Sequence, residues 1–348
     1  MIKVTGKGNI SATIIAHSKS AVDGKEIITY ELEYHRYIHS ELMTHRTFSR
    51  NAASSRAIPV SKMAYLVENT PAMPIYWGKN KAGMQASEEC NNEVSMDWDN
   101  YNDMPVSGTP QEAWAEASRN AVYKAVCFNE AGYHKQITNR LLEPFQMIKV
   151  VVTATEWDNF FWLRFHKAAQ PEIQELARCM LVAKKRSVAE VLNVGEWHTP
   201  YVAHHRTEDG LQYLVEDEDG QGYYVTVEEA LHVSASCVAQ TSYRKTDGSL
   251  EKADKVWQML TTDDRLHGSP LESQATPMVL PKMLTGESEV DCMCEGYTHC
   301  DKDGKFWSNN FCGWIQHRAL IANNSCTSFD YDQEVDETGL VITDSKDS

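Results

Sequence analysis

The sequence predicts a mixed fold of α/β or α+β class, and three stretches carry this prediction. Residues 1–35 alternate apolar and polar positions on either side of Asp23-Gly24, as the two strands of a β-hairpin do. Residues 110–131 have helical spacing, with acidic residues early and Gly132 placed as a C-cap. Residues 145–153 have the pattern of a strand. The spacing alone does not choose between α/β and α+β.

The remaining elements follow from the same patterns. Residues 36–56 take helical spacing, with Tyr37, Ile38, Leu42 and Met43 as an apolar stripe. Residues rich in proline and glycine indicate an irregular, ordered or unordered insertion over 66–110. From there to the C-terminus we expect a long amphipathic helix (155–182), polar turns with a hairpin (184–230), a helix (227–242), a stretch rich in Gly, Cys and Asp (283–310) and a final helix (313–324). We expect one domain over 1–330 and a frayed acidic tail over 331–348.

Composition excludes several classes of protein. The formal net charge of −16 argues against a protein that coats a nucleic acid polymer, because neutralising phosphates requires a basic surface. No run of about 18 apolar residues is present, so the sequence predicts no membrane span. Nine cysteines, an odd and scattered set, fit reduced thiols better than a secreted disulfide framework, so we expect a cytoplasmic protein.

The segment from Thr44 to Arg56 concentrates hydrogen-bond donors. It holds three arginines, a histidine, five hydroxyl side chains and one amide within thirteen residues. Arginine matches phosphate oxygens with two parallel hydrogen bonds, so a turn of this composition suits a phosphate ligand. A solvated polar helix end has the same composition, and the segment alone leaves both readings open.

This segment resembles the R-H-R-x-x-S-x-N-x-x-S-x-R motif of the flavin-dependent thymidylate synthases. It matches at His45, Arg46, Ser49, Asn51, Ser54 and Arg56, with Thr44 in place of the first arginine. A second block, Asn139–Pro144, is similar to the family's A-R-x-x-L-P segment, and Leu163-Arg164, Ala169-Gln170 and Glu172-Ile173 match its later helix in register. Arg140 and Arg164 each lie beside an apolar run, where a lone charge is costly, so we expect each to have a carboxylate or a ligand phosphate as partner.

A third block completes the resemblance in an altered order. Ala239–Tyr243 and His267–Glu272 look like the family's A-R-V-S-Y and H-x-[ST]-P-F-E-H segments, which usually precede the arginine-histidine motif and here follow it. This order indicates a circular permutation or another rearrangement, which a domain tolerates when its termini lie close together. A weaker echo of the motif lies at Trp314–Arg318. The chain departs from the family pattern at Thr44, Ala52, Thr153, Thr155 and Ala168.

The resemblance implies a central, mostly antiparallel sheet flanked by helices, with insertions. It also implies reductive methylation of dUMP to dTMP by a homotetramer with shared active sites, which uses FAD, NADPH and methylenetetrahydrofolate. Carried over residue by residue, it places the substrate at Ser54, Arg56, Arg140, Arg164 and the nearby Glu41. It places FAD at His45, Arg46, Asn51, Asn159, Ser242, His267 and Ser269, with Arg164 and His267 as the catalytic residues. Arg164 would stabilise negative charge that develops on the pyrimidine carbonyl oxygen.

Two alternatives remain at this stage. A related flavin enzyme that hydroxymethylates or otherwise modifies a pyrimidine nucleotide would fit the altered folate-side residues. A zinc-stabilised binding module is the second, because Cys292, Cys294, His299 and Cys300 offer thiols and an imidazole within nine residues. Their spacing matches no common zinc finger.

Overall fold

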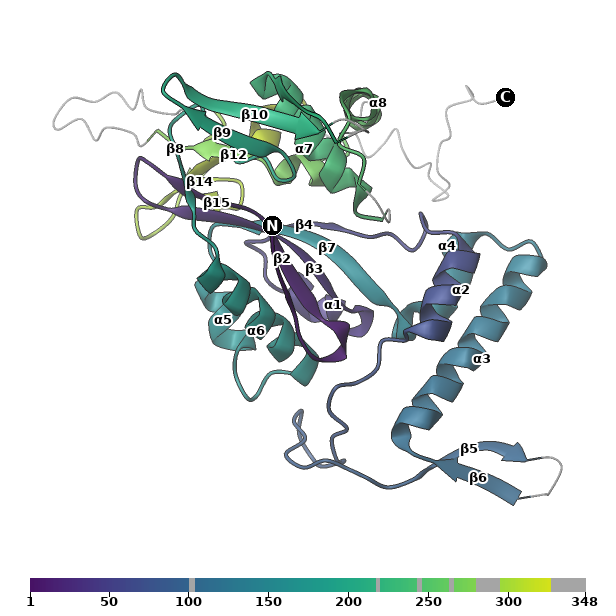
Figure 1. Ribbon diagram of the computed structural model, residues 1–348. Coiled ribbons are helices and arrows are strands. Elements are labelled where there is room, and N and C mark those ends of the chain that lie inside the picture. Colours follow the sequence, from purple (N-terminus) through teal and green to yellow (C-terminus); the bar gives the residue numbers. More distant parts are fainter. Residues whose placement is uncertain (100–103, 217–219, 243–245, 263–265, 280–294, 327–348) are drawn as a thin grey trace, which may run out of the picture.

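The protein is described from a computed structural model, which places residues 1–99, 104–216, 220–242, 246–262, 266–279 and 295–326 (Figure 1). The predicted acidic tail (331–348), residues 283–294 of the predicted stretch rich in Gly, Cys and Asp, and Tyr243 lie outside the described residues.

A mostly antiparallel sheet forms the centre of the fold. Its strands lie in the order β1-β2-β3-β7-β4, and all neighbours on this path are antiparallel. The short strand β8 adds to β2 in parallel. The strands are β1 (Ile2–Thr5), β2 (Ser11–Ser20), β3 (Glu26–His35), β4 (Ser49–Ala52), β7 (Met147–Ala154) and β8 (Glu190–Leu192). The predicted hairpin and the predicted strand at 145–153 are confirmed, as is the mixed fold with a central antiparallel sheet.

Alternation along β3 and β7 builds the main core. Tyr30 and Leu32 stand opposite Val152 and Val150, and all four side chains are buried in one cluster with residues of the helix α6. Two helices, α5 (Asp158–Arg164) and α6 (Pro171–Arg186), lie against this face (Figure 1). The single long helix predicted at 155–182 is therefore wrong. Pro171 opens α6, and the residue before a proline is driven to extended backbone, as Gln170 is with ψ 137°.

The motif region is also less helical than predicted. A 3₁₀ turn η2 (Arg36–Ile38) leads into α1 (His39–Met43), where the helix ends. The donor-rich segment then continues as β4, whose Ser49 and Asn51 pair with Thr153 and Val151 of β7. Sheet pairing outweighs the local helical spacing, because each strand residue gains a backbone partner that the sequence pattern does not reveal.

The predicted insertion is partly regular. Helix α2 (Val60–Asn69) packs on α3 (Pro110–Glu130), and the hairpin β5 (Val94–Asp99)–β6 (Met104–Gly108) leads into α3 and projects from the body (Figure 1). The predicted helix 110–131 is confirmed. Thr109 and Glu112 form a reciprocal capping box, and Gly132 has the positive φ of 87° expected after a helix end. The short α4 (Lys135–Thr138) and the 3₁₀ segment η3 (Asn139–Phe145) return the chain to β7.

The second half of the chain forms a lobe beside the sheet. A three-stranded sheet packs on α7, with a second helix, α8, against it. The regular elements are β9 (Ala203–Thr207), β10 (Gly210–Glu216), β11 (Gly222–Val225), α7 (Val227–Ala239), η4 (Gln240–Ser242), α8 (Leu250–Thr261), η5 (Ser269–Glu272), β12 (Ala275–Pro277), β13 (His299–Cys300), β14 (Phe306–Ser308), β15 (Phe311–Cys312), β16 (Trp314–Gln316) and η6 (His317–Leu320). The predicted hairpin within 184–230 and the predicted helix at 227–242 are confirmed.

The final helix predicted at 313–324 is wrong. Gly313 has a positive φ of 73°, and the chain then pairs as β16 with β12 before one 3₁₀ turn, η6. Trp314 and Ile315 are buried from this strand, and its partner β12 supplies the backbone hydrogen bonds.

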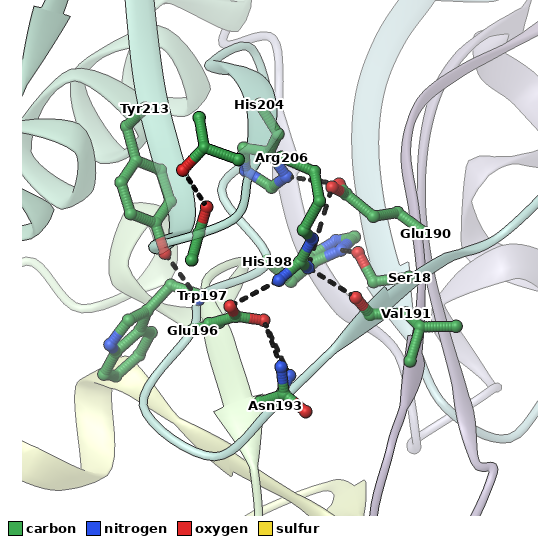
Figure 2. Close-up of polar contacts among 12 residues, drawn as sticks. Ser18, Glu190, Val191, Asn193, Glu196, Trp197, His198, His204, Arg206 and Tyr213 are labelled. Atoms are coloured by element: carbon green, nitrogen blue, oxygen red, sulfur yellow. Dashed lines mark hydrogen bonds and ion pairs between the residues drawn. The ribbon is translucent and has the colours of Figure 1, made fainter.

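A partly buried polar network ties the lobe to the sheet (Figure 2). His198 has no exposed surface, and its two ring nitrogens lie 2.8 Å from Ser18 Oγ on β2 and 2.8 Å from Thr29 Oγ1 on β3. His204 Nδ1 lies 2.6 Å from the Glu190 carboxylate, and Arg206 donates to Glu196 and to the Val191 carbonyl. Because both ring nitrogens have a hydrogen-bond partner, His198 holds its segment of the chain against β2 and β3. No helix of the described residues is long and apolar enough to cross a membrane.

Candidate functional site

The donor-rich segment lies at one end of the central sheet. It leaves α1 at Thr44, turns, and runs as β4, the last strand in the sheet order. Segments of the lobe cover β4: the 3₁₀ turns η4 and η5 both contact it. The site is therefore a convergence of the first and third sequence blocks, which lie about 190 residues or more apart in the chain.

One cluster joins Arg164, the last residue of α5, to the end of α1. Arg164 Nη1 lies 2.9 Å from Glu41 Oε2, and its Nε lies 3.0 Å from Nε2 of His45. Its Nη2 also lies 3.2 Å from the hydroxyl of Thr44. The residue that replaces the first motif arginine thus contacts Arg164. The anionic partner expected for Arg164 is a carboxylate, Glu41.

His45 is buried between aromatic rings. Its ring lies 5.6 Å from that of Phe48 and 5.0 Å, edge to face, from that of Phe160. Burial, followed by the positive charges of Arg164 and Arg50, lowers the pKa of His45 to about 4. The imidazole is therefore neutral at neutral pH, and it serves here as an acceptor for Arg164.

Arg50 holds the turn that carries His45 and Arg46. Its Nη1 donates to the carbonyls of Leu42, Met43 and His45, at 3.2, 3.2 and 3.0 Å. These carbonyls lie at and just beyond the end of α1, where the Leu42 and His45 carbonyls also accept from the backbone amides of His45 and Phe48. Arg50 was not among the predicted site residues, and its position between motif residues was the available signal.

A second cluster centres on Asn51. Its amide nitrogen donates to the Val238 carbonyl at 2.6 Å and to Thr241 Oγ1 at 3.2 Å, while its amide oxygen accepts from Ser269 Oγ at 3.0 Å. Nearby, the Ser54 amide donates to Ser242 Oγ at 2.9 Å. Four predicted residues from the first and third sequence blocks thus come together at this cluster: Asn51, Ser54, Ser242 and Ser269.

The segment Trp314–Arg318, which weakly resembles the motif, contacts β4 next to this cluster. Gln316 is buried, and its amide nitrogen donates to Ser49 Oγ and Asn310 Oδ1 at 3.1 and 2.9 Å. Arg318 forms an ion pair with Glu272 of the third block. Neither Asn310 nor Gln316 was among the predicted site residues. The echo was the signal for Gln316, and it proves to support the motif strand β4.

Two motif arginines face solvent. Arg46 and Arg56 are both exposed, and neither forms a hydrogen bond or ion pair from its guanidinium to another described residue. Both remain available to an anionic ligand or to a partner chain. This contrasts with Arg164, whose three nitrogens are all engaged.

Three other predicted residues lie apart from these clusters. Arg140 pairs with Glu143 at 2.6 Å, a carboxylate that also accepts from Arg36 at 2.8 Å. Asn159 is exposed on α5, and His267 is exposed just before η5, with its backbone amide bonded to the Leu260 carbonyl. The structure connects neither side chain to Asn51 or Arg164.

A large cavity of about 1490 Å³ opens beside the Arg164 cluster. Arg164 and Glu41 line it, together with the start of α6 and the extended chain between α2 and β5. Aromatic side chains, among them Tyr37, Tyr76 and Trp114, also line it, as do three lysines.

The described residues contain no group of three His, Cys, Asp or Glu side chains placed to hold a metal ion. Of the zinc candidates, Cys292 and Cys294 lie outside the described residues. His299 stacks on Trp307 at 5.9 Å, and Cys300 is exposed.

Comparison with known proteins places the chain. No curated protein matches it. Two solved structures of the UMP/dUMP methylase PolB from Streptomyces cacaoi match this chain. The structure bound with 5-Br dUMP matches at 16% identity and a TM-score of 0.37, and the match covers 53% of this chain and 93% of that one. The structure bound with 5-Br UMP matches at 15% identity and a TM-score of 0.34, and the match covers 51% of this chain and 89% of that one. The family model described as thymidylate synthase complementing protein matches residues 9–188, just over half of the 348 residues. The chain belongs to this family, the thymidylate synthase complementing proteins.

Proposed function

We propose that the protein is a flavin-dependent thymidylate synthase, which methylates dUMP to dTMP with methylenetetrahydrofolate as carbon donor and NADPH as reductant. The observation that carries the proposal is the match of the family model over residues 9–188, a range that contains both the Thr44–Arg56 segment and Arg164. The convergence of this segment with Ser242 and Ser269 supports it, because sequence blocks distant in the chain meet at one end of the sheet.

The donor set fits a nucleotide-bearing cofactor such as FAD. Arg46 and Arg56 are exposed guanidiniums, the groups that match phosphate oxygens best. Asn51, Ser242 and Ser269 add amide and hydroxyl groups that suit the polar edges of a nucleotide. When bound, FAD supplies the redox chemistry of the reaction. We assign Arg46, Asn51, Ser242 and Ser269 to the cofactor, with His267 and Asn159 as its more distant candidates.

In this proposal His45 does not contact the cofactor directly. It is buried, neutral and bonded to Arg164, so it positions that guanidinium. Glu41 fixes a second nitrogen of the same group. Arg164 is thereby held at the rim of the large cavity with a set orientation. Such a preorganised cation stabilises negative charge that develops on a pyrimidine carbonyl oxygen without reorganising in the reaction.

We assign the dUMP substrate to Arg164, Ser54 and Arg56, with Arg140 further away and already neutralised by Glu143. We also propose a homo-oligomer, with shared sites in a homotetramer as the specific expectation. Exposed apolar side chains flank the Arg164 cluster along the chain: Met43 beside Thr44, at 46% exposed surface, and Trp162, Leu163 and Phe165 beside Arg164, at 76%, 43% and 50%. Exposed apolar side chains gathered next to a functional cluster are typical of an interface.

The test is the visible spectrum of the purified protein together with its reaction products. We expect the absorption bands of oxidised flavin, bleaching by NADPH, and conversion of labelled dUMP to dTMP only when methylenetetrahydrofolate is present. A product with a hydroxymethyl group would instead show the related modifying activity. A colourless protein that does not bind added FAD would contradict the proposal.

A further inference from the structure

The chain between α2 and β5 folds into a defined element, here called the strap (Ala72–Cys90). Two backbone bonds close it on itself: Lys79 N to the Glu88 carbonyl at 2.8 Å and Cys90 N to the Trp77 carbonyl at 2.7 Å. Gly78 sits between these bonds, where an added Cβ would lie 2.2 Å from the Ala86 Cβ. The strap is therefore a built structure that requires glycine at its closest crossing.

Two residues of the strap, Ile75 and Gln85, form hydrogen bonds with the region around Arg164. Ile75 N donates to the carboxylate of Glu172 at 3.0 Å, and Gln85 Nε2 donates to the Ala168 carbonyl at 3.1 Å. Glu172 is only 3% exposed, so the strap amide helps to satisfy a buried carboxylate. From the other side, Trp114 Nε1 donates to the Ala72 carbonyl at 2.9 Å.

These anchors make the strap one wall of the large cavity. The end of α5 and the α5–α6 connection also line the cavity, with Arg164, Phe165 and Lys167. Ligand pockets usually measure about 300–1000 Å³. At about 1490 Å³ this cavity has room for more than one ring system. Tyr76 of the strap, Tyr37 and Trp114 supply aromatic surface on which such rings pack.

The charges that line the cavity favour an anion. Its acids have partners: Glu41 pairs with Arg164, Glu175 with Arg178 at 2.7 Å, and Glu172 accepts from Ile75 N and Gln170 Nε2. Lys7, Lys81 and Lys167 also line it and are exposed, with the Lys81 ammonium bonded to the neutral hydroxyl of Ser87. The lining therefore presents positive charge near aromatic surface.

We propose that the strap selects the ligand of this cavity, a planar heterocycle with an anionic tail, with Tyr76 packing on the ring and Lys81 contacting the tail. The inference rests on the proposed function, because the nucleotide, the folate and NADPH of that reaction all share this chemistry. The anion is a phosphate in dUMP and NADPH and a chain of glutamate carboxylates in the folate. Binding each compound separately distinguishes these sources.

The experiment compares Lys81→Glu with Lys79→Glu in the full-length protein. Lys79 lies on the same strap, is 63% exposed as a side chain and does not line the cavity, so it is a matched control. Calorimetry measures binding of dUMP, of tetrahydrofolate with one or five glutamates, and of NADPH. Reversing an exposed charge costs roughly 1 kcal/mol, so we expect Lys81→Glu to weaken one of these ligands about five- to tenfold and Lys79→Glu to change it less than twofold.

Each outcome decides the inference. A selective loss with Lys81→Glu supports it, and the affected compound names the ligand. Equal effects of the two substitutions, or no effect of either, would overturn it, as would a wild-type protein that binds none of the compounds. Binding is measured without turnover, so a protein that shows the selective loss and yet does not methylate dUMP retains the strap inference and loses the proposed function.

Discussion

The guanidinium of Arg164 donates through Nε to Nε2 of His45 over 3.0 Å. A guanidinium carries only donors, so the ring nitrogen that faces it must be unprotonated and the imidazole proton must reside on Nδ1. The pKa of His45, lowered to about 4 mainly by burial, agrees with this assignment. The pair fixes one edge of the guanidinium, and Glu41 fixes another.

Replacement of Arg164 by lysine tests whether this fixed geometry matters beyond charge. Lysine keeps the positive charge but cannot contact His45, Glu41 and Thr44 at once, because its ammonium is a single point. We expect Arg164→Lys to weaken dUMP binding at least about tenfold, the loss of one or more charged hydrogen bonds. Calorimetry with dUMP measures the effect, and Arg186→Lys at the exposed end of α6 is the control. An Arg164→Lys protein that binds and converts dUMP as the wild type does would refute the assignment.

Elements with a complete local signal were predicted well from the sequence. The β2–β3 hairpin has alternation and an Asp-Gly turn, and α3 has a capping box and a glycine stop. Two of the failures share one cause. Ser49–Ala52 and Trp314–Gln316 lie in stretches with helix-compatible spacing but pair as strands with β7 and β12, partners more than 30 residues away. Pairing of this range is not visible in a local window.

The candidate site was predicted in part for the same reason. Asn51 and Ser269, which are far apart in the sequence, were each identified as site residues. The hydrogen bond between them was not predicted. Arg50, Asn310 and Gln316 were missed, since each supports a motif residue from behind and none belongs to the matched pattern. The strap was read only as an irregular insertion, because backbone bonds such as Cys90 N to the Trp77 carbonyl leave no periodic pattern.

Asn51 offers a test of the second cluster that does not depend on catalysis. In Asn51→Asp a carboxylate oxygen would replace the amide nitrogen that now lies 2.6 Å from the Val238 carbonyl, and two acceptors would meet. We expect a loss of about 2 kcal/mol in the free energy of unfolding, measured by urea denaturation at pH 7. Asn159→Asp, on the exposed face of α5, is the isosteric control and should leave stability within about 0.5 kcal/mol. Equal stability of the two variants would show that Asn51 does not hold β4 to α7.

Thiol labelling tests whether the buried cysteines are inert. Burial raises the pKa of Cys179 and Cys312 to about 11 and that of Cys237 to about 12. The thiolate is the reactive form. Iodoacetamide at pH 8 should therefore modify the exposed Cys300 and Cys326 at least about 100-fold faster than the three buried cysteines. Peptide mapping by mass spectrometry over time gives the rates. Rapid labelling of Cys237 in the native protein would contradict the burial of this α7 residue in the core of the lobe.

The acid sensitivity of the lobe should depend on His317. Its ring stacks on Trp257 at 5.8 Å and meets Trp197 edge to face at 5.5 Å, and its buried Nδ1 has no hydrogen-bond partner among the described residues. Burial, and then the nearby His232, lower the pKa of His317 to about 4. Between pH 6.5 and 4 the unfolded chain therefore binds a proton that the folded protein refuses, so the stability present above pH 6.5 falls as the pH falls.

From pH 7 to pH 5 this single group removes about 2 kcal/mol from the free energy of unfolding. His317→Phe keeps the aromatic stack and cannot be protonated, so the difference in unfolding free energy between pH 7 and pH 5 should shrink by about that amount. Urea denaturation at both pH values measures it, with His205→Phe, on the exposed strand β9, as the matched control. Other histidines with lowered pKa, among them His45, titrate in both proteins and leave the comparison intact. If His317→Phe lost as much stability on acidification as the wild type, the folded protein would have to accommodate the imidazolium between Trp257 and Trp197 without cost.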